Sequence, residues 1–425
     1  MPKNEKQGNN SLKKNKRSLE AKGFYSDCER DGTLYAALIR SPAATGKVKS
    51  ITIPELPKDY FLFTADDIPG KKNFSINNQE WKIFGYNNVS YSGEPLGILC
   101  GPDEDKLFEL LDTISVNFDI ESLESALNNA IKLQKRPVVQ FSETEKDISN
   151  FVSQLNDLPS LDNVLDNNQV EQDVEKTIAQ REIKTGLFQK YSPEEADTKL
   201  FDDTEDFISS ETWNLKLLAP NWKETSGAFC YTEGKDVHIY SPTRWTKSLM
   251  EIVSSTLKLP LENIFVHKTK TSGIFSKGMW RTSVIAAQVA VAAYLTSKPI
   301  KLILSQKEQE TFMSPGVNTN VTYKTAISST GIIKAIYAYI DVDTGCYNPF
   351  AQEIIDRMAI AACNYYKPQN VHIIAKAHNS KNPPTSICLK GVDSQIFFAI
   401  ENQLQKITDQ TNLLPEEIRL ISLAW

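Results

Sequence analysis

The feature that most constrains the fold is an apolar helix placed directly after a polar loop. Residues 284–295 are mostly alanine, valine and other apolar residues, which predicts a helix buried on all sides. The loop before it, 268–281, is rich in Lys, Thr, Ser and Gly. Free backbone N–H groups and the positive dipole end at such a helix start favour an anionic group. Alternating residues at 264–268 and 300–304 predict strands on either side, so the stretch 243–304 predicts a sheet built around one helix.

The length and charge of the chain limit its class. With 425 residues and 40% hydrophobic residues, it is long enough for two or three domains with true cores. Residues 1–22 are rich in lysine and predict a basic, disordered leader. A nucleic-acid-binding arm is disfavoured, because the leader has no aromatic residue and the chain carries a net charge of −6. No apolar run is long enough for a signal peptide or a membrane span, so we expect a cytoplasmic protein without nucleic-acid or membrane partners.

The cysteines and histidines do not predict a metal site. The six cysteines lie far apart and form no Cys-x-x-Cys pair, which argues against zinc ribbons and against iron–sulfur ligation within this chain. We interpret them as reduced, mostly buried thiols. The four histidines fall in or near predicted strands without metal-ligand spacing, so we expect them to be satisfied sheet or surface residues.

Composition and hydrophobic pattern divide the chain after the leader into a folded unit, a linker and a second folded segment. Short strands between Thr33 and Cys100, followed by a helix capped by Asp103, predict a compact α+β unit over residues 23–120. Residues 121–210 are rich in Asn, Asp, Glu and Gln, which predicts an acidic linker with short helices, partly disordered. Strands and helices return over 211–425, with a hairpin turn at Ser329-Thr330-Gly331.

Two sets of phrases resemble one enzyme family in the same order along the chain. The first unit resembles the hammerhead domain of xanthine dehydrogenases and aldehyde oxidases at Leu34–Pro42, Leu62–Gly70 and Gly93–Ile98. The last segment resembles the first molybdopterin-binding domain of that family at Ser241-Pro242-Thr243, Gly331–Ala335, Asp341–Gly345 with Tyr347, and Asn382-Pro383-Pro384. The resemblance therefore implies an α+β fold, with an α/β-hammerhead domain followed by a mixed-sheet molybdopterin-binding domain.

The resemblance also implies a function. In that family a molybdenum–molybdopterin cofactor hydroxylates a carbon of a heterocycle or an aldehyde with water-derived oxygen. The catalytic glutamate lies in the C-terminal half of the subunit, beyond the part that this chain resembles, so no catalytic residue is expected here. The implied partners are a separate C-terminal molybdopterin-binding half, a 2Fe–2S subunit and an FAD subunit, and this chain alone is not expected to be active.

The loop before the apolar helix departs from the family pattern. Where the family has Gly-Gly-Gly-Phe-Gly-Gly-Lys, this chain has residues 272–278. The resemblance assigns cofactor contacts to Gly273, Phe275 and Gly278, and a substrate contact to Phe275 as well. Ile274 and Ser276 replace glycines that let the backbone approach the metal closely. An alternative stays open, in which Phe275 fills a core and Lys277 faces solvent.

Other implied site residues also depart from the pattern. Arg244 stands where the family has a glutamine beside the metal, and a surface arginine is the alternative interpretation. Lys390 replaces a substrate-binding arginine, and Val392 replaces an aromatic clamp; both are assigned to substrate. Gly391 and Gln395 are assigned to the cofactor, because Gln395 matches the family's glutamine beside the pterin.

Two alternatives follow from these departures. The chain could be a non-catalytic scaffold relative that kept the fold for interactions, with its cofactor motifs eroded. It could also be a truncated remnant, which predicts exposed apolar surface where a missing half would pack. The substrate does not follow from these residues, and whether the cofactor is still bound stays open at this point.

Overall fold

The architecture is that of a computed structural model of the chain, which describes residues 23–77, 79–119, 177–202, 206–216, 224–271, 280–313, 316–385 and 392–423. Helices and mixed sheets alternate within these ranges, so the expected α+β class is confirmed. The expected leader, 1–22, and residues 120–176 of the expected linker lie outside the described residues.

The larger sheet joins strands that are far apart in the sequence. Its order is β13-β12-β11-β14-β1-β7-β3. The bounds are β1 Leu34–Arg40, β3 Phe61–Thr64, β7 Pro95–Gly101, β11 Gly227–Glu233, β12 Asp236–Tyr240, β13 Ile264–His267 and β14 Ile300–Ile303. Strand β1 runs parallel to β14, with Leu34 opposite Ile300 and Ala36 opposite Leu302. The expected units 23–120 and 211–425 therefore share one sheet.

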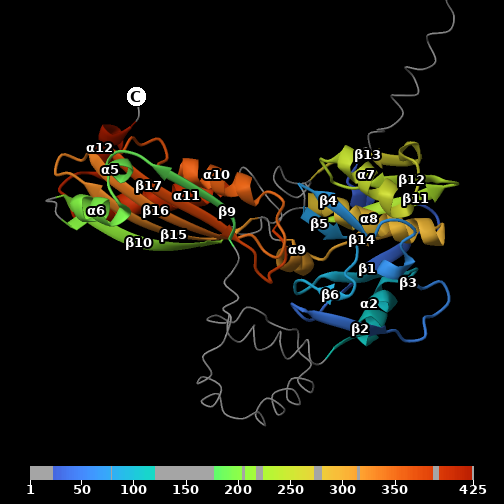
Figure 1. Cartoon of the computed structure of the whole chain (residues 1–425). Coiled ribbons are helices and arrows are strands. Elements are labelled where there is room, and N and C mark those ends of the chain that lie inside the picture. The colour runs from blue at the N-terminus through green and yellow to red at the C-terminus, as the bar shows by residue number, and fades with distance from the viewer. Residues whose placement is uncertain are drawn as a thin grey trace, which may run out of the picture.

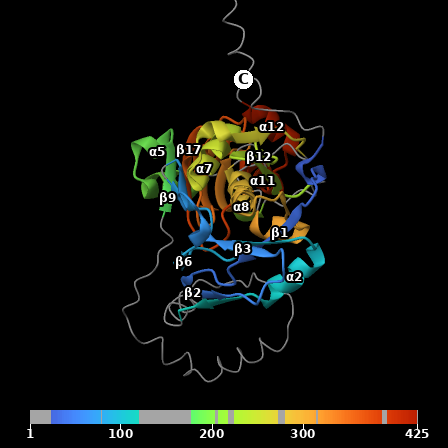
Figure 2. The same ribbon diagram turned by 90° about the vertical axis from the view of Figure 1, so that its right-hand side faces the viewer.

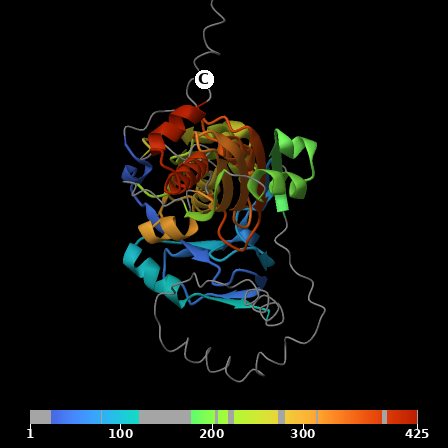
Figure 3. The same cartoon turned by 90° about the vertical axis from the view of Figure 1, so that its left-hand side faces the viewer.

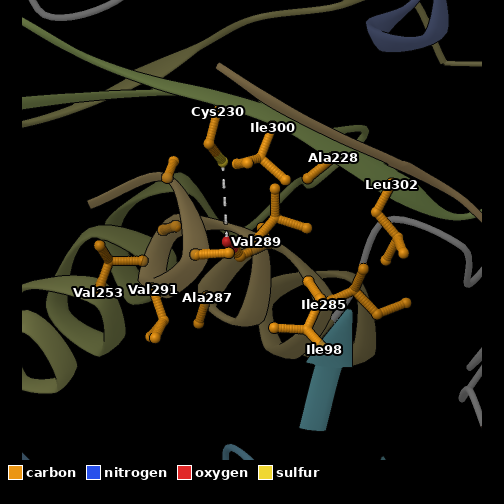
Figure 4. Close-up of a cluster of buried hydrophobic side chains, with 14 of the residues drawn as sticks. Ile98, Ala228, Cys230, Val253, Ile285, Ala287, Val289, Val291, Ile300 and Leu302 are labelled. Carbon is orange, nitrogen blue, oxygen red and sulfur yellow. Dashed lines mark hydrogen bonds between the residues drawn. The ribbon is translucent and has the colours of Figure 1, made fainter. Parts of the chain in front are cut away.

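Two helices, α7 (Thr246–Leu257) and α8 (Trp280–Thr296), pack beside this sheet. The expectation that the apolar helix is buried is confirmed, because Ala286, Val289 and Ala290 are fully buried. Figure 4 shows α8 against the strands, where the Cys230 thiol donates to the carbonyl oxygen of Ala286 at 3.9 Å. Small side chains on α8 allow this close approach, which fixes the position of the helix start relative to the sheet.

A smaller unit lies at one end of the larger sheet. It contains a three-stranded sheet, β6-β2-β8, while the hairpin β4-β5 lies apart from it beside α8. In Figures 1 and 2 the helix α2 and strand β2 lie at the lower end of the molecule. The predicted cap of α2 is confirmed, since the Asp103 side chain accepts the Lys106 N–H at 3.0 Å. The bounds are α2 Glu104–Thr113, β2 Gly46–Thr52, β4 Asn73–Ile76, β5 Gln79–Lys82, β6 Asn88–Val89 and β8 Ser115–Phe118.

The second large sheet has the order β10-β15-β16-β17-β9. The bounds are β9 Thr177–Lys184, β10 Phe207–Lys216, β15 Asn318–Ile327, β16 Ile333–Asp343 and β17 Asn370–His378. The predicted hairpin is confirmed, because β15 and β16 pair antiparallel. Helices α10 (Ala351–Ala361) and α11 (Val392–Thr408) pack on this sheet, and α12 (Pro415–Ser422) packs on α11. Figure 3 views the molecule from this side, and Figure 1 shows α9 (Gln306–Phe312) between the two large sheets.

The linker expected over 121–210 is wrong for residues 177–202. Strand β9 forms the edge of the second sheet and pairs with β17, with Ala375 opposite Arg181. Helices α5 (Leu187–Lys190) and α6 (Pro193–Asp197) follow it, and a π-helical turn at Thr198–Asp202 adds buried Leu200 and Phe201. The polar composition of residues 121–210 predicted a linker. A polar segment can still be a strand, because an edge strand with one solvated face needs few apolar residues.

Single-turn 3-10 helices lie at Tyr25–Asp27, Ala65–Asp67 and Leu261–Asn263. In the part of the chain that the structure describes, no helix combines the length and the apolar character needed to cross a membrane.

Candidate cofactor site

A buried arginine stands at the start of α8. Arg281 lies in the first turn of the helix and is only 9% exposed. Its Nη1 donates to the carbonyl oxygens of Phe312 and Pro384. Charge-assisted bonds of this kind are stronger than neutral ones, so Arg281 holds three segments of the chain at one point.

This junction lies next to the loops that hold the expected site residues. Arg281 lies two residues after the loop 272–279, and Pro384 lies two residues before the loop 386–391; both loops lie outside the described residues. Gly273, Phe275 and Gly278 belong to the first loop, and Lys390 and Gly391 to the second. The structure therefore brings together the ends of the two loops but does not place these five residues. We did not predict Arg281 from the sequence, although it is the only charged residue in α8 and that signal was available.

The segment that leads into the second loop also packs against the turn after β16. Gly345 has a φ of 75°, and a Cβ at this position would collide with the carbonyl oxygen of Pro383. The Cys346 N–H donates to the Asn382 carbonyl at 2.9 Å. Position 345 therefore requires glycine, because the backbone of residues 382–384 approaches it closely. This contact brings the two phrases at 341–345 and 382–384 together in space.

Aromatic rings connect the junction to the first unit of the chain. The ring centroids of Trp81 and Trp280 are 4.0 Å apart, and those of Trp81 and Tyr347 are 4.9 Å apart. The hydroxyl groups of Tyr347 and Ser90 lie 2.8 Å apart. Residues from β5, from α8 and from the turn after β16 therefore form one packed cluster.

Arg244 lies beside the same helix start. Thr243 Oγ1 accepts the Trp245 N–H at 3.1 Å and lies 3.3 Å from Ser283 Oγ, in the first turns of α8. Arg244 itself is exposed, just before α7 begins. Its position fits either expectation, a group that reaches an anion near α8 or a surface arginine.

Val392 and Gln395 lie on α11, against the second sheet. Val392 is 2% exposed and belongs to the core that α10, α11 and that sheet enclose. The Gln395 Nε2 donates to Val317 O at 3.1 Å and to Leu215 O at 3.4 Å, while its Oε1 accepts from Thr319 Oγ1 at 3.5 Å. To contact a pterin, this amide would have to exchange at least one of these bonds. The roles of both residues stay predictions.

At the Arg281 junction, the described residues alone do not form a pocket of pterin size. The cavity at the junction has a volume of about 30 Å³ and is lined by Arg40, Trp81, Glu94, Trp280 and Arg281, among others. Since one water needs roughly 10–15 Å³ by the same measure, this space fits one or two water-sized groups. A pterin site would need the two loops at 272–279 and 386–391, which lie outside the described residues.

The described histidines pair with neighbouring side chains, as expected, whereas only Cys100 and Cys230 of the five described cysteines are buried. His238 Nδ1 lies 2.9 Å from His267 Nε2, His372 pairs with Glu182 at 2.9 Å, and His378 lies 3.2 Å from Asp341. No group of three or more metal-ligating side chains occurs among the described residues. The described cysteines Cys28, Cys100, Cys230, Cys346 and Cys363 carry free thiols.

Comparison with known protein families gives one match over more than half of the chain. Residues 180–423 match the model of a molybdopterin cofactor-binding domain. The matched range begins within β9 and ends after α12, so it covers all of the second sheet except the first three residues of β9, its helices, and α7 and α8.

Curated relatives and solved structures extend the similarity to nearly the whole chain. The chain is 21% identical to aldehyde oxidase 2 of Cavia porcellus over 93% of its own length, and 21% identical to xanthine dehydrogenase of Dictyostelium discoideum over 95%. It spans only 26% of the length of each of these relatives.

Two solved structures share the fold at low sequence identity. The aldehyde oxidoreductase of Desulfovibrio desulfuricans superimposes with a TM-score of 0.70 at 16% identity, covering 93% of this chain and 41% of the other. Quinoline 2-oxidoreductase of Pseudomonas putida gives 0.67 at 16% identity, covering 95% and 48%.

Proposed function

The chain belongs to the family of molybdopterin cofactor-binding domains, and from this premise we propose that it is the N-terminal part of the molybdopterin-binding subunit of a molybdenum hydroxylase. Such an enzyme hydroxylates an aldehyde or heterocycle carbon with oxygen from water. The proposal includes a separately encoded C-terminal half that supplies the catalytic base, and iron–sulfur and flavin subunits that carry the electrons away. When bound, the molybdenum–molybdopterin cofactor supplies the redox chemistry.

The observation that carries the proposal is the junction at Arg281. This guanidinium ties the ends of the loops that contain Phe275 and Lys390 to the carbonyls of Phe312 and Pro384. Burying the Arg281 charge would cost desolvation energy if its hydrogen bonds were not made. These bonds therefore hold the described ends of both loops in place without a ligand. Arg281 acts here as a positioning residue for the loops, and Phe275, Gly273, Gly278, Lys390 and Gly391 are the residues proposed to contact cofactor or substrate.

Exposed apolar side chains on the helices of the second sheet support the proposal that a separate C-terminal half binds there. Large apolar side chains are exposed on α11, around the ends of α10 and on α12, including Ile360 at 72% and Tyr365 at 73% exposure. Phe398, Leu414, Leu420 and Ile421 are also exposed, and Tyr365 stacks on Phe397 at 6.4 Å. Soluble monomers seldom expose so many large apolar side chains on neighbouring elements. The surface suits a partner that packs there, and it also suits the truncated-remnant hypothesis.

The second candidate function is a non-catalytic scaffold. It is favoured by Ile274 and Ser276, which stand where the family has glycines, and by the small size of the cavity at the junction. In this case the chain keeps its fold and its partner surface but holds no cofactor.

One co-expression experiment separates these possibilities. The full chain is purified alone and together with the products of the adjacent reading frames, and molybdenum and pterin are measured per chain. We expect both at close to one per complex, with hydroxylase activity only in the complex. Pure complexes without molybdenum and pterin would support the scaffold instead. Failure of the lone chain to unfold cooperatively would support the remnant hypothesis.

Variants then test the residues. Phe275→Ala and Lys390→Ala should lower hydroxylase activity in the complex at unchanged thermal stability. Phe108→Ala is the matched control, because Phe108 is 46% exposed and lies on α2, outside the proposed partner surface. Equal activity loss in Phe275→Ala and Phe108→Ala would show that the loop has no special role.

A further inference from the structure

The cavity at the Arg281 junction has an uncompensated positive charge. Three cations line it: Arg40, Lys82 and Arg281. Arg40 Nε lies 3.2 Å from Glu308 Oε1, and Lys82 Nζ lies 3.8 Å from Glu94 Oε1. Arg281 has no carboxylate within ion-pair distance among the described residues, so the cluster as described carries one more positive than negative charge.

The neighbouring loops cannot supply the missing carboxylate. The segments 272–279, 314–315 and 386–391 adjoin the described ends that Arg281 holds, and none of them contains Asp or Glu. Two of them add cations instead, Lys277 and Lys390. Burial lowers the pKa of Arg281 to about 10, the nearby Tyr91 opposes this shift, and the like charge of Arg40 adds to it. Neither the described residues nor these three adjoining segments therefore give this guanidinium a carboxylate partner.

Two of the residues that line the same cavity carry indole N–H groups without a partner. The indole N–H groups of Trp81 and Trp280 are buried and find no acceptor in the described part of the chain. Both rings line the cavity, and Trp280 is fully buried. Buried N–H groups without a partner are rare in folded proteins, because each costs about 1–3 kcal/mol when unsatisfied. Two donors and one unpaired cation around one space favour a negatively charged occupant.

The size of the cavity limits the occupant. At about 30 Å³ it holds a group of the size of one or two waters, which excludes a pterin. Water is the neutral alternative, since Gln288 Oε1 also lines the cavity as an acceptor without a partner among the described residues. Water would satisfy the indoles and the amide but would leave the charge of Arg281 uncompensated.

We propose that this cavity is a binding site for a small monatomic anion such as chloride, held by the Arg281 guanidinium and the indole N–H groups of Trp81 and Trp280. The anion completes the charge balance of the junction and stabilises the point where the loop ends meet. This inference does not depend on the proposed oxidoreductase function, because it concerns only the described residues of this chain.

Halide binding to the full chain tests the proposal. The protein is purified in sodium gluconate, and its thermal unfolding midpoint is followed during titration with sodium bromide, sodium gluconate or sodium sulfate at constant ionic strength. We expect a saturable rise with bromide only, and an anomalous bromide peak between Arg281 and Trp280 in crystals grown with bromide. Equal shifts with all three salts, or a cavity that holds only water in those crystals, would overturn the proposal.

A conservative variant isolates the donor. Trp280→Phe removes the indole N–H while keeping an aromatic ring, and we expect its bromide dissociation constant to rise by roughly tenfold or more, as for loss of a hydrogen bond to a charged group. Trp245→Phe is the matched control, because Trp245 packs on Phe350 outside the cavity lining. Unchanged bromide affinity in Trp280→Phe, or an equal loss in Trp245→Phe, would refute the assigned role.

Discussion

The histidine pair on β12 and β13 shows how one buried residue makes stability depend on pH. Burial first, and then the neighbouring His238, lower the pKa of His267 from 6.5 to about 4. The contact of 2.9 Å between His238 Nδ1 and His267 Nε2 has room for only one proton. The folded state therefore binds fewer protons than the unfolded chain, so the stabilisation is full above pH 6.5 and is lost as the pH falls towards 4.

We predict that the urea midpoint of the full chain falls between pH 6.5 and pH 4, and that His267→Phe reduces this slope. Phenylalanine keeps the stacking on Tyr240, whose ring centroid lies 4.3 Å from that of His267, but it cannot take up a proton. Midpoints at pH 7, 5.5 and 4.5 provide the measurement. A slope that is identical in both proteins would mean that other groups, such as the carboxylates, dominate the acid response.

Two buried glutamines on α11 allow a structural role to be separated from a cofactor role. Gln395 donates to Val317 O, and Gln403 Nε2 donates to Ser209 O at 2.9 Å. We predict that Gln395→Leu and Gln403→Leu each lower the unfolding free energy by about 1–3 kcal/mol, because each leaves a backbone carbonyl without its donor. If Gln395 also contacts a pterin, only Gln395→Leu should reduce the pterin content of the complex. Equal pterin contents in the two variants would restrict Gln395 to packing.

At the scale of elements, the turn after β16 controls how the segment 380–385 docks. We predict that Gly345→Ala destabilises the protein by about 2–4 kcal/mol, from the strained φ plus the collision with Pro383. Gly234→Ala is a matched control, since Gly234 has a φ of 62° but no atom lies within 4 Å of an added Cβ. It should cost only about 1–2 kcal/mol. Chemical denaturation measures both, and equal losses would show that the collision is relieved by a small shift.

At the scale of the whole molecule, the two large sheets take strands from outside the expected domain 211–425. β1 completes the first sheet beside β14, and β9 completes the second beside β17. We predict that a fragment of residues 211–425 does not unfold cooperatively and exchanges its amide hydrogens rapidly in β14 and β17, whose edges become exposed. A fragment with the same urea transition as the full chain would show that the expected domain boundary is a true folding boundary.

The sequence by itself determined the local elements and much of the first core. Apolar patterning located α8, the alternating runs located β13 and β14, and Asp103 marked the start of α2, because helix and strand repeats and caps are local properties. The ordered phrases were enough to indicate the family, which the match over residues 180–423 then confirmed.

Only the tertiary structure decided which distant strands pair and what Arg281 contacts. Strand pairing is a long-range choice, so the mostly polar residues of β9 gave no sign of their place beside β17. A buried arginine is stable only where other segments bring carbonyls to it, and Phe312 and Pro384 do so from 31 and 103 residues away. The sequence predicts only a general anion-binding motif in the loop before the apolar helix. The structure shows that Arg281, in the first turn of that helix, is bonded to the carbonyl oxygens of Phe312 and Pro384.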